Sequence, residues 1–292
     1  MRLHLHLGVH KTATTHIQHT LGANTGWLAA RGRAAPVEAD IQQIFQRPMK
    51  WALDPPVNWA VIRGSVSDGL RDASGAADLT ILSFERFLGP LRDLFARDAL
   101  YPEAPTRLAA LAGLLRDHEV CVFLALRDYG AFAASAYCEA LRWGPFFPFD
   151  AVREDLLREG LLDWRPLVGA VQDAFGPDAV RLWRYEDYAN APAPILRTLL
   201  DLTENPTTEV AAQPRVRYSA AAVALMGREA TALPPRAHPR RIAELAEEYP
   251  VDGARPGFDP WTAEEAGLLS TRYAAHLSEL PAPLFLPSPD RA

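Results

Sequence analysis

The sequence has little lysine. Its thirty basic residues include only two lysines, Lys11 and Lys50, and the others are arginine. Such a chain uses arginine wherever a generic positive charge suffices. A lysine in a loop of small residues therefore indicates a role for a compact ammonium group that can donate a proton.

Cysteine and long apolar runs are scarce as well. Cys121 and Cys138 are too few for a disulfide framework and lack metal-ligand spacing, so we expect two small buried residues and no metal. No stretch is long and uncharged enough to span a bilayer. The alternating start, Met1–Gly8, does not have the pattern of a signal peptide. We therefore expect a cytoplasmic protein without a membrane span.

Positive charge is also in deficit, because thirty Lys and Arg face thirty-six Asp and Glu, a net charge of −6. That sign disfavours nucleic acid as a partner, so an anionic ligand must be held by local positive charge. With 292 residues and 49% hydrophobic content, the chain can bury a sizeable core. We expect a single domain, residues 1–292, with an α/β core at 1–205 and a helical extension at 206–292.

Strand patterns alternate with helical patterns along the core. The strand segments are Arg2–Leu7, Asp78–Ser83, Glu119–Leu126 and Ala179–Tyr185, and helical patterns lie around His16–Leu21, Ala131–Arg142 and Ala193–Leu202. A near-continuous apolar strand such as Val120–Leu126 is typical of a strand covered on both faces. The alternation predicts an α/β fold with a parallel sheet flanked by helices.

Two less regular stretches separate these patterns. Residues 33–77 mix Pro, Trp and Gly, which indicates a loop-rich insertion. Residues 206–262 are rich in Pro and Arg around a helix at Ala220–Ala230. A last amphipathic helix is expected at Ala263–Leu280.

The segment Gly8–Thr15 has the character of a phosphate-binding loop between a strand and a helix. Gly8 permits a tight turn, and small residues let backbone N–H groups approach a phosphate at a helix N-terminus. Lys11 supplies the full charge. The loop is not a Walker A sequence, because His10 stands where that motif needs Gly. The alternative is an ordinary strand-to-helix turn capped by Thr.

The run GVHKTATTHIQ resembles the 5′-phosphosulfate loop of bacterial-type sulfotransferases that depend on 3′-phosphoadenosine-5′-phosphosulfate (PAPS), usually Lys-Ser/Thr-Gly-Thr-Thr. The resemblance implies a fold like that of P-loop nucleotide hydrolases. Ala13 stands where this family commonly has Gly. We expect Ala13 in the first helical turn, where it is unstrained, and not at a positive φ. By resemblance, the PAPS-binding residues of the loop are His10, Lys11, Thr12, Ala13, Thr14 and Thr15.

A second motif follows the third strand. Arg127 closes that strand and Ser135 lies eight residues later, which resembles the sulfotransferase 3′-phosphate motif. Arginine presents a planar fork to a phosphate, and a helix hydroxyl can donate to another oxygen. ATP has no 3′-phosphate, so this pair favours PAPS. The alternative is that Arg127 pairs with Asp128 or a nearby acid and Ser135 has no special role.

Further residues come from the same resemblance, which covers roughly residues 3–202. Tyr185 begins a Tyr-Glu-Asp similar to one that approaches the adenine, although a buried aromatic is nearly as plausible. A late arginine often closes on the 3′-phosphate, and Arg215 and Arg217 are candidates.

The resemblance implies that Lys11 stabilises the leaving oxygen and that Glu85, in a Ser-x-Glu similar to the family's, is the general base. An ion pair of Glu85 with Arg86 is equally plausible. His10 and His16 are rival bases.

Three hypotheses follow. The first is a sulfotransferase that uses PAPS, releases PAP (adenosine 3′,5′-bisphosphate) and needs no metal. The second is a small-molecule kinase with Thr12 and Asp128 holding Mg²⁺, and the third is a non-catalytic PAP-binding relative. The acceptor is a small molecule, carbohydrate or lipid, and residues 33–77 and 206–262 are expected to build its pocket. Candidate sugar-stacking residues, which can equally belong to the core, are Trp51, Trp59 and Trp261.

Overall fold

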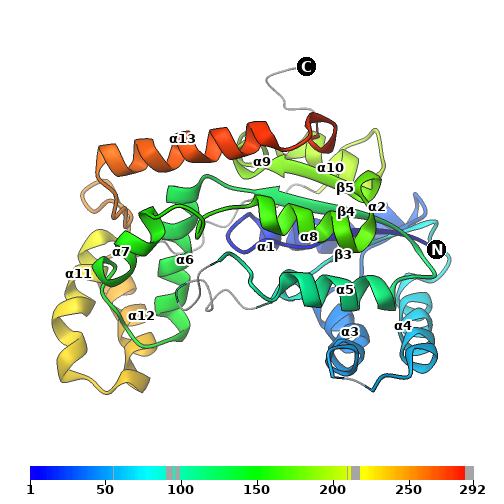
Figure 1. The fold of residues 1–292 in the computed structure, drawn as a ribbon, viewed down its shortest axis with the longest axis horizontal. Helices are drawn as coiled ribbons and strands as arrows, with labels where there is room; N and C mark the ends of the chain where they lie inside the picture. The colour runs from blue at the N-terminus through cyan, green and yellow to red at the C-terminus, as the bar shows by residue number, and fades with distance from the viewer. Residues whose placement is uncertain (55, 90–94, 96–98, 209, 212–217, 287–292) are drawn as a thin grey trace.

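The protein is built around one parallel sheet. The computed structural model describes residues 1–54, 56–89, 95, 99–208, 210–211 and 218–286. Five strands pair in the order β2-β3-β1-β4-β5, all parallel. They are β1 (Arg2–His6), β2 (Arg33–Ala34), β3 (Leu79–Ser83), β4 (Glu119–Leu126) and β5 (Val180–Arg184). Figure 1 labels β3, β4 and β5 of this sheet. The predicted parallel α/β fold is confirmed.

Helices cover both faces of the sheet. Side chains alternate along each strand, so Leu124 and Leu182 belong to one apolar cluster while Phe123 and Trp183 belong to the other. The larger layer contains α3 (Glu38–Ala52), α4 (Trp59–Ser74), α5 (Ala104–Leu114), α6 (Tyr129–Trp143) and α8 (Arg165–Phe175). The smaller layer contains α1 (Thr14–Ala23), α2 (Thr25–Ala29), α9 (Tyr185–Asn190) and α10 (Pro192–Leu200).

The expectation of a loop-rich insertion at residues 33–77 is wrong. The segment forms strand β2 and the packed helices α3 and α4. Its apolar residues recur every fourth position and are buried, which is the spacing of a helix face: Ile41, Phe45 and Met49 on α3, and Ile62, Val66 and Leu70 on α4. Pro48 within α3 and the glycines of α4 obscured this period in the sequence.

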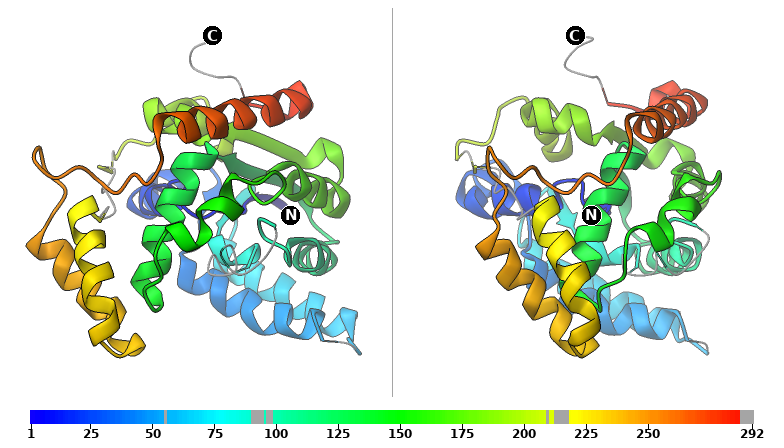
Figure 2. Two further views of the ribbon diagram at one scale, coloured as in Figure 1. Left: turned by 60° about the vertical axis from the view of Figure 1, so that its left-hand side comes forward. Right: turned by 90° about the vertical axis from the view of Figure 1, so that its left-hand side faces the viewer.

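The predicted helical C-terminal region is confirmed. α11 (Ala220–Glu229) and α12 (His238–Glu248) form a pair, and α12 packs against α6 (Figure 2). α12 was not anticipated in its Pro- and Arg-rich surroundings. His238 links this pair to the segment after α6, since its Nδ1 accepts a hydrogen bond from the Phe146 N–H at 2.9 Å. α13 (Ala263–Glu279) begins with a capping box and also contacts α6. The next helix after α6 in the chain is α7 (Asp150–Leu157).

The described residues lack two features. Within the ranges given above, no helix combines the length and apolarity needed to cross a membrane. In the same part of the chain, no three His, Cys, Asp or Glu side chains gather in a way that suits a metal ion.

Candidate functional site

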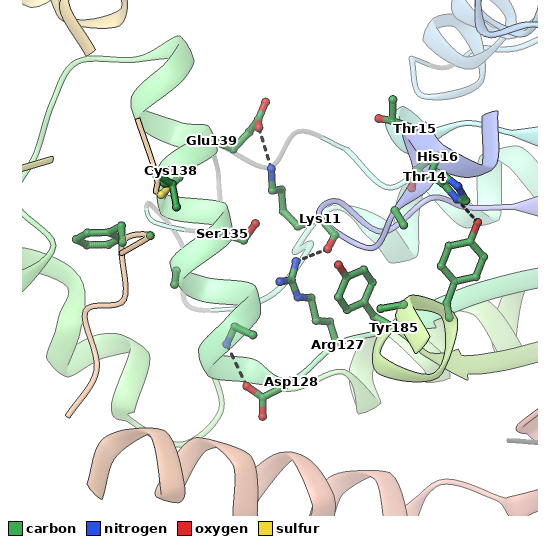
Figure 3. A pocket seen from close by; sticks show the side chains of 18 of the residues that line it. Lys11, Thr14, Thr15, His16, Arg127, Asp128, Ser135, Cys138, Glu139 and Tyr185 are labelled. Carbon is green, nitrogen blue, oxygen red and sulfur yellow. Dashed lines mark hydrogen bonds and ion pairs between the residues drawn. The ribbon is translucent and has the colours of Figure 1, made fainter. Parts of the chain in front are cut away.

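A cavity of about 1690 Å³ opens at the carboxyl edge of the sheet (Figure 3). The segments after β1, β3, β4 and β5 contribute Lys11, Glu85, Arg127 and Tyr185 to its lining. After β1 the chain enters α1 on one face of the sheet, and after neighbouring β4 it enters α6 on the other. Such a divergence leaves a crevice in which ligands of parallel α/β proteins bind.

The loop after β1 has an unusual backbone. Lys11 and Ala13 both have φ of 66°, and Gly8 has φ of 59°. The expectation for Ala13 is therefore wrong, because Ala13 is the left-handed N-cap of α1 and the helix begins at Thr14. A non-glycine residue in this region is strained by about 1–3 kcal/mol. Left-handed residues in a tight loop turn successive N–H groups into a concave surface that suits an anion.

Gly8 also brings Glu85 to the loop. A Cβ at position 8 would lie 3.0 Å from the Cα and the backbone nitrogen of Glu85. Only glycine allows the end of β3 to approach this closely. Glu85 begins a short 3₁₀ turn, Glu85–Phe87, and lines the cavity beside the loop.

The Lys11 side chain crosses the cavity to α6. Its Nζ donates to Glu139 Oε2 at 3.0 Å, and the two side chains are only 8% and 18% exposed. Glu139 lies one helical turn beyond Ser135, and both line the cavity. An ion pair this sheltered is screened by salt much less than a surface pair.

Arg127 is buried at the end of β4 and connects three parts of the site. Its Nη1 donates to the Lys11 carbonyl oxygen at 2.5 Å, and its guanidinium carbon lies 4.3 Å from the Tyr185 ring centroid. Its own carbonyl oxygen accepts from Trp164 Nε1 at 2.9 Å. Figure 3 shows Ser135 on the face of α6 that is turned toward Lys11 and Arg127.

Two acidic residues hold the neighbouring helices in place. Asp128 caps α6, because its Oδ1 accepts from the Ala131 N–H at 3.0 Å. The Asp128 N–H donates to Glu186 Oε1 at 3.0 Å, which ties the start of α6 to α9. Tyr185, the first residue of α9, is thereby positioned beside Arg127.

Most of the residues expected to bind a nucleotide line this one cavity, but His10 and Thr12 do not. Tyr101 OH accepts from the His10 N–H at 3.0 Å and lies 2.8 Å from its Nδ1. The fully buried Thr12 donates its hydroxyl to the Val9 carbonyl at 2.5 Å. Both residues therefore stabilise the loop without lining the cavity. The expected residues that do line the cavity are Lys11, Ala13, Thr14, Thr15, Glu85, Arg127, Ser135 and Tyr185.

His16, a rival candidate for the base, lines the cavity but is engaged at both ring nitrogens. Its Nδ1 lies 2.6 Å from Tyr188 OH and its Nε2 lies 2.9 Å from the Val210 carbonyl.

Residues between 206 and 262 also line the cavity, and they include Tyr218, Phe258 and Trp261. Trp261 Nε1 donates to the Gly130 carbonyl at 3.0 Å. None of the described residues between 33 and 77 lines the cavity, so Trp51 and Trp59 lie outside it. Arg215 and Arg217 lie outside the described residues.

Sequence reasoning missed Glu139, Arg142 and Trp143. Glu139 and Arg142 line the cavity, and Trp143 Nε1 donates to Glu139 Oε1 at 2.9 Å. The four-residue spacing from Ser135 to Glu139 to Trp143 was the available signal, because such residues share one helix face.

Comparison with known proteins adds little. No family model matches the chain, and no curated protein matches it. Among solved structures, a sulfotransferase from Alicyclobacillus acidocaldarius is similar at 15% identity and a TM-score of 0.43, over 84% of this chain and 95% of that one. At this level of superposition the likeness does not bear on function.

Proposed function

We propose that this protein is a PAPS-dependent sulfotransferase that moves a sulfuryl group to the hydroxyl of a small-molecule, carbohydrate or lipid acceptor. The observation that carries the proposal is one shared cavity. It is lined by Lys11 on a left-handed phosphate-type loop and by the Arg127 and Ser135 pair. An amine and a guanidinium at separate points suit a nucleotide with two separate anionic groups.

Different residues of the site would contact different parts of the nucleotide. The loop N–H groups and the start of α1 would hold the 5′-phosphosulfate, and Arg127 and Ser135 would hold the 3′-phosphate. Tyr185, whose ring lies under the Arg127 guanidinium, is positioned to contact the adenine. The cavity of about 1690 Å³ is larger than the pockets of ordinary small ligands, which leaves room for an acceptor.

In the proposed reaction, the acceptor oxygen forms a bond to sulfur as the bond between sulfur and the bridging oxygen breaks. Lys11 supplies positive charge to the leaving oxygen, a contribution that typically amounts to about 3 kcal/mol of barrier. Glu85, beside the loop, accepts the proton of the acceptor hydroxyl, and a positioned base typically contributes about 10²–10⁴ in rate.

The kinase hypothesis is less well supported. Of its two Mg²⁺ candidates, Thr12 is fully buried with its hydroxyl on the Val9 carbonyl, and Asp128 caps α6. Thr12 does not line the cavity, and although Asp128 does, its carboxylate points away from Lys11 in Figure 3.

The test is transfer of labelled sulfate from PAPS to a panel of glycans, lipids and phenols, together with thermal shifts. PAP should raise the unfolding temperature without Mg²⁺, and ATP should not. Stabilisation by ATP with Mg²⁺ alone would contradict the proposal. Binding of PAP without transfer to any acceptor would favour a non-catalytic relative.

A further inference from the structure

One face of α6 leads out of the nucleotide cavity to an exposed indole. Ser135, Glu139 and Trp143 follow at four-residue intervals, so they lie along one side of the helix. Ser135 and Glu139 line the cavity, while Trp143 ends the helix and is 76% exposed. Trp143 does not itself line the cavity, but its exposed ring is hydrogen-bonded to Glu139, which does.

The exposed indole is held in a defined orientation. Its Nε1 donates to Glu139 Oε1 at 2.9 Å, and Glu139 Oε2 accepts from Lys11 Nζ at 3.0 Å. The two oxygens of one carboxylate therefore connect the indole to the proposed catalytic amine. Because Lys11 and Glu139 are both sheltered, this arrangement fixes the indole relative to the place where the sulfuryl group is expected.

We propose that Trp143 is a stacking platform for a pyranose ring of the acceptor and that Glu139 is the residue that positions this platform. The proposal rests on the proposed function and names an acceptor subsite beside the same cavity, next to Glu139 and Arg142, which line it. A pyranose has an apolar face that covers an indole and a rim of hydroxyls that needs polar partners.

The surroundings of Trp143 suit such a ring. The Glu139 carboxylate is adjacent, and the guanidinium carbon of Arg142, which also lines the cavity, lies 5.5 Å from the indole centroid. These charged groups can exchange hydrogen bonds with ring hydroxyls. A phenol or a sterol would instead need an enclosed apolar pocket, which an indole with this exposure does not provide.

The test begins with calorimetric titration of methyl glucoside, methyl galactoside, cellobiose and lactose into the protein saturated with PAP. We compare the wild type with W143A, W143F and the control W51A. Trp51 is an exposed tryptophan near the end of α3, and no residue of that helix lines the cavity. At least one saccharide should bind the wild type. W143A should raise the dissociation constant of that saccharide tenfold or more. W143F should raise it less than threefold, and W51A should leave it unchanged.

Steady-state kinetics then test the positioning role of Glu139. With the saccharide that binds, E139Q should raise the acceptor KM more than it lowers kcat. A fall in kcat alone would overturn this role, because it would indicate action on the chemistry and not on the platform.

The remaining outcomes separate this inference from the proposed function. If the wild type binds PAP but no saccharide, or if W143A binds the saccharide as the wild type does, the platform is overturned. The platform is also overturned if W143A weakens the binding of PAP as much as it weakens the binding of the saccharide. If the wild type does not bind PAP, the proposed function fails, and the subsite fails with it.

Discussion

The guanidinium of Arg127 donates a hydrogen bond to the carbonyl oxygen of Lys11, with 2.5 Å between the heavy atoms. The two residues are 116 positions apart in the sequence. Arg127 directly follows β4, and Lys11 lies in the loop after the neighbouring strand β1. The residues proposed to hold the two ends of PAP are thus hydrogen-bonded to each other. Their separation is set before any nucleotide binds, which reduces the ordering that binding must impose.

Replacement of Lys11 by Ala should lower the rate of sulfate transfer by about 10²–10³, because a preorganised charge at the leaving oxygen is lost. K11R should recover little of this rate, since a planar guanidinium cannot place its charge as a compact ammonium group does. The matched control is K50A, which removes the exposed lysine on α3. Retained turnover in K11A with an unchanged unfolding temperature would contradict the assigned role.

Replacement of Ser135 by Ala should weaken PAP binding by about tenfold or more, because hydrogen bonds to charged groups contribute about 1.5–3 kcal/mol. AMP lacks the 3′-phosphate, so its affinity should not change. Isothermal titration of both nucleotides measures the difference, with S278A on the exposed side of α13 as the control. An equal loss for PAP and AMP would place Ser135 elsewhere on the nucleotide.

Replacement of Ala13 by Gly should raise the free energy of unfolding by about 0.5–1 kcal/mol. Relief of the strain at φ 66° outweighs the extra flexibility that glycine gives the unfolded chain. The same substitution at Ala224, an exposed position within α11, should cost about 1 kcal/mol. Urea unfolding measures both, and equal losses in the two variants would contradict the left-handed conformation.

His6 should make the fold less stable in mild acid. The ring is fully buried, its Nδ1 lies 2.9 Å from Ser83 Oγ, and burial lowers its pKa to about 3. The unfolded chain binds this proton near pH 6.5 and the folded chain does not. His6 therefore contributes stability above pH 6.5 that is lost as the pH falls toward 3, at up to about 1.4 kcal/mol per pH unit.

Between pH 7.5 and pH 5, this effect of His6 amounts to about 2 kcal/mol. Urea unfolding at the two pH values should show a smaller difference for H6N than for the wild type. H19N, which changes an exposed histidine of α1, is the control. A pH dependence in H6N equal to that of the wild type would contradict the lowered pKa.

The sequence predicted the elements whose apolar pattern is simple. Strand β4 lies at Glu119–Leu126, as expected, because its near-continuous apolar run suits only a strand buried on both faces. Helices α3 and α4 were missed because proline and glycine interrupt an otherwise regular four-residue period. The Pro, Trp and Gly content of residues 33–77 favoured a loop. The four-residue period of the apolar residues was the better guide, because it indicated the two helices.

Only those parts of the candidate site that lie within one continuous sequence motif could be predicted. Ala13 was expected in a helical conformation, although the resembling family commonly has Gly there, which was the available sign of a positive φ. The pairing of Lys11 with Glu139 depends on how α6 crosses the end of the sheet. Such a contact between distant segments is set by tertiary packing and has no signature in either segment alone.

The residues that line the cavity come from early and late parts of the chain. Every proposed nucleotide contact among the described residues precedes residue 190, whereas Tyr218, Phe258 and Trp261 follow residue 205. Substitutions at these three aromatic residues should therefore change the cavity lining while the proposed nucleotide contacts and Trp143 keep their identities.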